Sequence, residues 1–164
     1  MIPVVRALLP PPWPEIEPLI RESEREGFRF LARLRREFEA GSTRFDRAGE
    51  VLLGVERGAD LVAVGGLTLD PYEAEPRVGR LRHLYVLPSH RRRGAGRLLV
   101  AALVEAARPH FDTLTLRTDT EAAARFYQAL GFAPAAGSEH HTHRLALRPA
   151  SPPSTSDRSR SGDP

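Results

Sequence analysis

The order of strand-like and helix-like segments in the second half of the chain constrains the fold more than any other feature. Residues Val78 to Leu87 have the pattern of a strand, Gly94 to Ala107 that of a helix with one apolar stripe, and Phe111 to Leu116 that of another strand. A helix over Glu121 to Leu130 and a final strand over His141 to Leu147 complete the alternation. Strands that alternate with helices favour a partly parallel sheet covered by helices.

The first half of the chain adds a hairpin and a pair of helices. Val51 to Val55 and Leu61 to Leu69 are rich in β-branched and aliphatic residues and flank a short turn. Apolar residues recur at helical spacing on both sides of Gly27, which predicts two helices rather than one. A first strand is expected over Ile2 to Leu9 and one more near Phe132. The sequence therefore predicts an α+β fold with three layers, α/β/α, around a mixed sheet.

The composition of the C-terminal segment predicts where the folded domain ends. Residues 149–164 contain no Val, Ile, Leu or aromatic residue and are dominated by Ser, Pro and charged residues, Arg among them. Such a segment cannot offset the entropy cost of its own ordering. We therefore expect one folded domain over residues 1–148 and a disordered tail over residues 149–164.

Composition also excludes several classes of protein. The chain has no Cys, so it forms no disulfide and offers no thiolate nucleophile or metal ligand. No apolar stretch reaches the roughly 20 residues that a membrane helix needs, and prolines interrupt the N-terminal segment where an export signal would be continuous. We expect a cytoplasmic protein with no membrane partner.

The basic character of the chain is weaker than its isoelectric point of 10.1 suggests. All 24 of its basic residues are Arg, and the formal net charge is only +3. Because Arg titrates only above about pH 12, these residues raise the isoelectric point without creating a strong field. The chain also lacks an aromatic-basic platform and a recognition-helix pattern, so no nucleic-acid partner is expected.

The loop before the helix that starts at Gly94 gives the clearest chemical signal. It has the sequence Arg91-Arg92-Arg93-Gly94-Ala95-Gly96. The two glycines let the backbone approach a ligand closely, and the free N–H groups at a helix start favour an anion such as a pyrophosphate. The three arginines add charge-assisted donors beside it. A solvated arginine run before an ordinary helix is the simpler alternative.

The helix over Glu121 to Leu130 gives the second signal, a pair of adjacent aromatic residues. Phe126 is expected to fill the core. Tyr127 points about 100° away around the helix, so it need not be a core residue as well. Its hydroxyl group can donate a proton, although a packing role for this ring is the alternative.

Together these segments resemble the GNAT superfamily of acyl-CoA-dependent N-acetyltransferases. The pyrophosphate loop of that family, [Gln/Arg]-x-x-Gly-x-[Gly/Ala], is matched by Arg91, Gly94 and Gly96. Leu84 to Pro88 resembles the end of the family's fourth strand, and Ala123 to Phe132 resembles its late helix with a Gly-Phe ending. The resemblance implies a mostly antiparallel sheet with a splay between its fourth and fifth strands.

The resemblance also implies an enzyme that moves the acetyl group of acetyl-CoA to a primary amine by direct attack in a ternary complex. The pantetheine would lie along Leu84 and Val86, with the Val86 N–H polarising the thioester carbonyl. Tyr127 would protonate the departing thiolate. Thr120 replaces an Asn that often contacts the cofactor in the family. No metal is expected, and the residues expected to hold the pyrophosphate are Arg91, Arg92, Arg93, Gly94, Ala95, Gly96 and Arg97.

The base that deprotonates the acceptor amine is less clear, because the fourth strand has no Glu where many family members carry one. His83 is the candidate, with His141 and His143 on the last strand as rivals and a structural, hydrogen-bonded His as the alternative. Arg80 or Arg82, if inward, would favour an acceptor with a carboxylate or phosphate.

The sequence leaves the acceptor and the assembly open. Its expected partner is a small-molecule or peptide amine, and the protein is expected to be a monomer or a homodimer. A catalytically inert acyl-CoA-binding sensor is the alternative to an enzyme.

Overall fold

A sheet with strand order β1-β2-β3-β4-β5-β7-β6 forms the centre of the molecule. Neighbouring strands are antiparallel, except β4 and β5, which are parallel. The structure is a computed structural model and describes residues 1–147. Its strands are β1 (Val4–Ala7), β2 (Val51–Arg57), β3 (Asp60–Leu69), β4 (Val78–Val86), β5 (Thr113–Leu116), β6 (Ala133–Pro134) and β7 (His143–Ala146).

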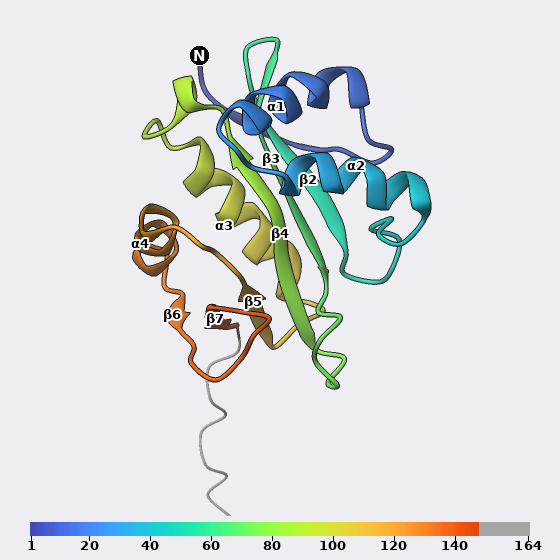
Figure 1. Ribbon diagram of the computed structural model, residues 1–164, viewed down its shortest axis with the longest axis vertical. Coiled ribbons are helices and arrows are strands. Elements are labelled where there is room, and N and C mark those ends of the chain that lie inside the picture. Colours follow the sequence, from blue (N-terminus) through green and yellow to red (C-terminus); the bar gives the residue numbers. More distant parts are fainter. Residues whose placement is uncertain (148–164) are drawn as a thin grey trace, which may run out of the picture.

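Helices cover both faces of this sheet (Figure 1). Helices α1 (Trp13–Arg25) and α2 (Phe30–Ala40) pack on one face against β3 and β4, whereas α3 (Ala95–Ala107) packs on the other. Helix α4 (Glu121–Ala129) packs on the same side as α3, and a single 3-10 turn, η1 (Pro88–His90), follows β4. The predicted three-layer α+β fold is therefore confirmed.

The finer predictions agree with the structure as well. The helical pattern breaks at Gly27, which has a φ of +86°, so α1 and α2 are separate helices. The additional strand expected near Phe132 is β6. Within residues 1–147 no helix is long and apolar enough to cross a bilayer. The tail predicted for residues 149–164 lies outside the described residues.

Strand β4 parts from β5 a third of the way along its length. Its pairing with β5 ends at Arg80, whereas β4 itself continues to Val86. On its other edge the register with β3 shifts, so that His83 and Leu84 lie opposite the single residue Gly65. His83 adopts a φ of +58°, in the left-handed region. Because a bulge bends a strand and increases its twist, this one accounts for the opening between β4 and β5. The predicted splay is confirmed.

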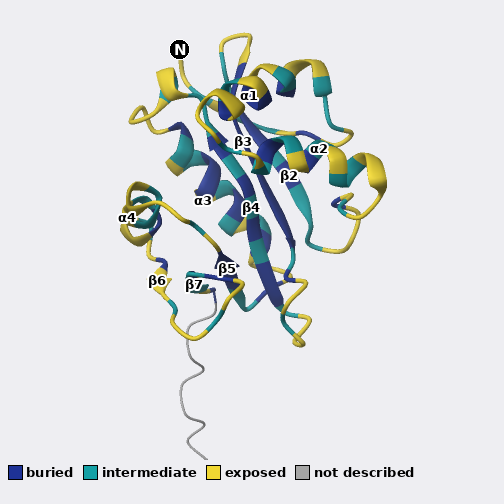
Figure 2. Cartoon of the chain, in the orientation of Figure 1, coloured by how far each residue is buried: buried dark blue, intermediate teal, exposed yellow. Residues whose placement is uncertain are grey.

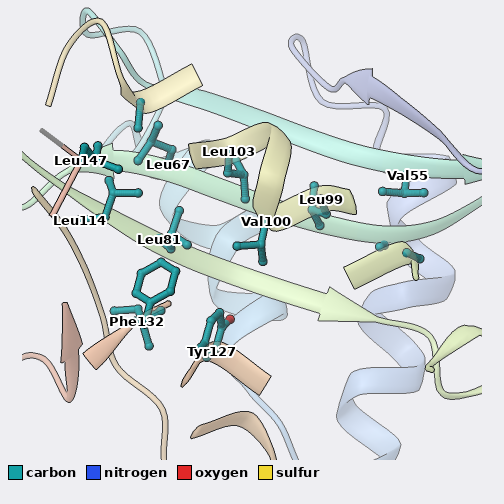
Figure 3. Packing of buried hydrophobic residues seen from close by; sticks show 14 of the residues in the cluster. Val55, Leu67, Leu81, Leu99, Val100, Leu103, Leu114, Tyr127, Phe132 and Leu147 are labelled. Atoms are coloured by element: carbon teal, nitrogen blue, oxygen red, sulfur yellow. The ribbon is translucent and has the colours of Figure 1, made fainter. Parts of the chain in front are cut away.

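Two apolar clusters hold the layers together, one on each face of the sheet. Buried residues run along β3 and β4 and along the side of α3 that faces the sheet (Figure 2). The α3 cluster also takes in Tyr127 and Phe132, which lie beside Leu81 and Val100 (Figure 3). The second cluster joins α1 and α2 to the opposite face of β3 and β4. The splayed end of β4 is therefore held between two packed layers.

Candidate functional site

The loop between β4 and α3 presents an uncapped helix start to open space. Gly94 occupies the N-cap position with a φ of +85° and has no side chain to bond the first N–H groups of α3. A Cβ atom built at Gly94 would meet no atom within 4 Å. The unpaired N–H groups at a helix start carry partial positive charge, so this loop suits an anion.

Gly96 brings the same helix start close to the splayed strand. A Cβ atom at this position would lie only 3.3 Å from side-chain atoms of both Val86 and Phe126. The absence of a side chain therefore lets the first turn of α3 approach β4 and α4 together. The anion site and the open edge of β4 become neighbours as a result.

The backbone of β4 beyond the bulge has polar groups that face this opening. The Leu87 N–H donates to Val62 O on β3, so Leu87 points its backbone groups toward β3. Alternate residues of a strand point these groups to opposite edges. The backbone N–H and C=O groups of Leu84 and Val86 therefore face the side from which β5 has parted.

Of the arginines in the loop, Arg91 is held by the protein itself. Its guanidinium forms two hydrogen bonds with Glu26, which follows α1, at 2.7 and 2.8 Å, and its Nε donates to Val86 O at 3.0 Å. The hydroxyl of Tyr85 donates to the same Glu26 carboxylate. The bonds from Arg91 and Tyr85 lower the pKa of Glu26, against the opposing effect of burial. Arg91 thereby ties the loop to the end of α1.

The other loop residues point outward. Arg92, Arg93 and Arg97 are exposed, and Arg92 has a φ of +60°. Ala95, in contrast, is buried at the start of α3. The predicted arginine donors thus divide into one that fixes the loop and three that are free to approach an anion.

Both rings of the aromatic pair on α4 pack against the core. Tyr127 is buried, at 8% exposed, whereas Phe126 is only partly buried. The Tyr127 ring makes edge contacts with Phe126 and Phe132, with centroids 5.1 and 5.6 Å apart. Phe126 packs against the core as expected, and Tyr127 is buried more deeply, which agrees with the packing role given as its alternative. Burial raises the pKa of Tyr127, which keeps its hydroxyl protonated at neutral pH.

His83 lies in the bulge with a defined tautomer. Its Nδ1 is 3.0 Å from Phe30 O, and because a carbonyl only accepts, Nδ1 carries the proton. The Nε2 atom is buried without a hydrogen-bond partner in the described part of the chain, 3.9 Å from a carboxylate oxygen of Glu37. Burial, together with the nearby charge of Arg82, lowers the pKa of His83 to about 3. The ring is therefore neutral at neutral pH, with its free lone pair on Nε2.

Of the remaining candidates, Thr120 and His143 make local hydrogen bonds. Thr120 caps α4 by accepting from the Ala123 N–H at 3.2 Å. His143 is buried, and its two ring nitrogens contact Thr142 Oγ1 at 2.9 Å and Gln128 Nε2 at 3.2 Å. His141, two residues earlier, is buried as well. Within residues 1–147 no group of three or more acidic or His side chains is placed to hold a metal ion.

The pH dependence of stability gives a direct check on His83. Its folded pKa lies below the unfolded value of about 6.5, so the unfolded chain binds more protons between these two values. Stability should therefore fall as the pH drops from about 6.5 toward 4, with His83 contributing up to about 1.4 kcal/mol per pH unit.

Urea unfolding at several pH values would measure this slope. A His83→Asn variant keeps a residue that tolerates positive φ but removes the titrating ring. Its stability should depend less steeply on pH over the same interval. Equal slopes for the two proteins would show that His83 is not buried in its neutral form.

Comparison with known proteins agrees with this geometry. The model of the acetyltransferase (GNAT) family matches residues 6–132. The chain belongs to this family. It is accordingly an acyltransferase by family. No curated protein sequence matches it significantly.

Solved structures show the same fold. A protein from Exiguobacterium sp. 255-15, provisionally classed as an acetyltransferase, is 32% identical with a TM-score of 0.76 over 89% of this chain and 94% of its own. The ribosomal-protein-S18-alanine N-acetyltransferase of Escherichia coli is 16% identical, with a TM-score of 0.66 over 91% and 96%. A Salmonella typhimurium protein of the same provisional class, solved with acetyl-CoA, is 18% identical, with a TM-score of 0.55 over 76% and 78%.

Proposed function

We propose that this GNAT family member transfers the acetyl group of acetyl-CoA to a primary amine by direct attack within a ternary complex. The observation that supports it best is that an unpaired strand edge and an uncapped helix start follow each other along the chain. The backbone groups of Leu84 and the Val86 N–H, which β5 leaves unpaired, are followed by η1 and then by the uncapped start of α3 at Gly94. A strand edge can bind an extended pantetheine arm, and the helix start can bind its pyrophosphate.

The proposed chemistry needs few side chains, because positioning and stabilisation of the oxyanion supply most of the rate. The Val86 N–H would polarise the thioester carbonyl as the amine attacks its carbon. The C–S bond then breaks, and Tyr127 would donate its proton to the leaving thiolate. The pyrophosphate would bind the backbone N–H groups from Arg92 to Arg97, beside exposed guanidinium groups.

His83 remains our candidate for accepting the amine proton. Its Nε2 has the unprotonated lone pair that a base requires, and its Nδ1 is fixed by Phe30 O at 3.0 Å. A pKa of about 3 makes the ring a weak base toward an ammonium with a pKa near 10.4. The amine would therefore have to reach the site already deprotonated, and His83 would accept the proton that its nitrogen loses after attack on the thioester. Turnover should then rise with pH well above 7.

The decisive experiment follows release of free CoA thiol while primary amines are screened with acetyl-CoA. The screen should include small amines, peptides with free N-termini and peptides with a lysine side chain. Release that depends on both the amine and the protein, together with an acetylated product in the mass spectrum, would support the proposal. Tight binding of acetyl-CoA without turnover of any amine would favour the inert sensor instead.

A further inference from the structure

Arg80 is a partly buried guanidinium whose hydrogen-bonding capacity is not filled by the protein. It lies on β4 at the last position that pairs with β5, between Thr68 on β3 and Thr115 on β5. Its Nη1 atom is buried and has no hydrogen-bond partner in residues 1–147. A buried donor without an acceptor is costly, and more so when it is charged. The site therefore favours an incoming acceptor of hydrogen bonds.

Arg82 provides a contrast on the same face of the sheet. Two residues beyond Arg80, it donates from Nη2 to a carboxylate oxygen of Glu37 on α2 at 3.3 Å. The charge of Arg82 is thus compensated within the protein. Arg80 has no comparable ion pair within 4.0 Å among the described residues.

The carboxylate that attracts Arg80 is already engaged by other groups. Asp70 is 2% exposed, and its oxygens accept from Thr115 Oγ1 at 2.6 Å and from the Tyr72 N–H at 2.8 Å. Asp70 favours the charged form of Arg80, whereas Arg82 and Arg117 oppose it, and burial has the largest effect in lowering the Arg80 pKa. The surroundings of Arg80 therefore leave a guanidinium donor free.

Two loops place an aromatic wall beside this guanidinium. The Tyr72 and His140 rings stack with centroids 3.9 Å apart and an interplanar angle of 2°. The guanidinium carbon of Arg80 lies 5.2 Å from the centre of the Tyr72 ring. These rings come from the β3–β4 and β6–β7 loops, at the end of the sheet remote from the start of α3 (Figure 1). Helices α1 and α2 pack on β3 and β4.

We infer that Arg80 binds an anionic group of the acceptor, a carboxylate or a phosphate, while the acceptor amine reaches the splay. This inference rests on the proposed acetyl transfer, because it names the class of its acceptor. A forked guanidinium suits both anions, and the stacked pair of Tyr72 and His140 forms a wall against which the acceptor's carbon chain packs.

The position of Arg80 also sets the length of the acceptor. Six positions along β4 lead from Arg80 to Val86, whose N–H is proposed to polarise the thioester, and six positions of extended strand correspond to about 20 Å. The arginine side chain spans part of this distance. The amine and the anion of the acceptor are therefore several bonds apart, as in an ω-amino acid or a short peptide, rather than adjacent as in glycine.

The test compares acids with uncharged partners of the same shape. Amino acids of graded length, from glycine through β-alanine and γ-aminobutyrate to ε-aminocaproate, are assayed by thiol release beside their carboxamides. Phosphoethanolamine and ethanolamine form the phosphate arm. The proteins are the wild type, Arg80→Gln, Arg80→Lys and the charge-matched control Arg36→Gln, which removes an exposed arginine of α2.

We expect the wild type to prefer a longer acid over its carboxamide by about tenfold or more in kcat/KM. Arg80→Gln should raise KM for the acid by about 10- to 100-fold and abolish this preference. Its KM for acetyl-CoA and its rate with the carboxamide should not change. Arg80→Lys, which keeps the charge but loses the fork, should be intermediate, and Arg36→Gln should match the wild type.

Two results would overturn the inference while leaving acetyl transfer intact: equal use of acids and carboxamides by the wild type, or an acid preference that survives in Arg80→Gln. If acetyl-CoA binds but no amine releases thiol, the proposed function itself fails. Calorimetry with CoA-loaded protein would then test the anion site by itself, because it compares the affinity of each acid with that of its carboxamide. Binding of acids no tighter than carboxamides, or no detectable binding of either, would exclude it.

Discussion

Replacing Tyr127 with Phe should slow the chemical step by about 100- to 10,000-fold, with little change in stability or in affinity for acetyl-CoA. The substitution removes only the hydroxyl, so the edge contacts of the ring with Phe126 and Phe132 remain. Burial raises the pKa of Tyr127, so the lost group is a proton donor throughout the neutral range. A CoA thiol has a pKa near 8.5 by analogy with Cys, which places the effect toward the lower end.

Single-turnover kinetics with an accepted amine would measure this effect apart from product release. Phe132→Leu is the matched control, because it disturbs the packing around Tyr127 but leaves the hydroxyl in place. Its chemical step should slow much less than that of Tyr127→Phe. If the chemical step is unchanged in Tyr127→Phe, the proton comes from water or another residue, and Tyr127 is a packing aromatic.

Local sequence patterns were sufficient to predict the elements and the layers of this fold. The periodicity of apolar residues separates strand from helix, and Gly27 and Gly131 mark ends of helices through backbone conformations that glycine adopts readily, with φ of +86° and +99°. The loop from Arg91 to Gly96 was also recognisable, because glycine spacing before a helix has a direct consequence for backbone shape.

Contacts between distant segments were not predictable in the same way. Arg91 is predicted to lie beside the pyrophosphate, and its bonds to Glu26, which lies 65 residues earlier in the chain, were not foreseen. Neither residue type nor spacing indicates which carboxylate an exposed arginine will meet. Glu26 was therefore missed, although it fixes the loop that the sequence identified.

The orientation of individual side chains depended on how whole elements dock. The helical period places Phe126 and Tyr127 about 100° apart, but only the packing of α4 against β4 and α3 decides which of them is buried. His83 is a similar case, because its positive φ belongs to a bulge opposite Gly65 and not to a preference of histidine. The sequence identified these residues as candidates, but their burial and contacts are known only from the three-dimensional packing.

Gly94→Asp should weaken acetyl-CoA binding by about 10- to 1000-fold, because it places a carboxylate where the pyrophosphate is proposed to bind. At about 4 Å two like charges repel by about 1 to 4 kcal/mol near a protein surface. The new side chain has room, since no atom lies within 4 Å of a Cβ at this position. Asp is also one of the few residues that tolerate the φ of +85° found there.

Gly94→Asn isolates the charge, because Asn has nearly the same size, tolerates the same φ and can cap the helix. Its affinity for acetyl-CoA, measured by calorimetry, should lie between those of the wild type and Gly94→Asp. Adding salt should narrow the gap between the two variants, since screening weakens repulsion between exposed charges. Equal affinities for the Asn and Asp variants at low salt would show that the pyrophosphate binds elsewhere.

The melting temperature of Gly94→Asp, measured with and without acetyl-CoA, would separate a loss of binding from a general loss of stability. An Asp at Gly94 can itself accept from the free N–H groups of α3 and interact favourably with the helix dipole, which offsets the strain of positive φ. The melting temperature of Gly94→Asp without ligand should therefore stay close to that of the wild type. Saturating acetyl-CoA should raise it much less, because the carboxylate and the pyrophosphate compete for the same N–H groups and ligand stabilisation follows affinity.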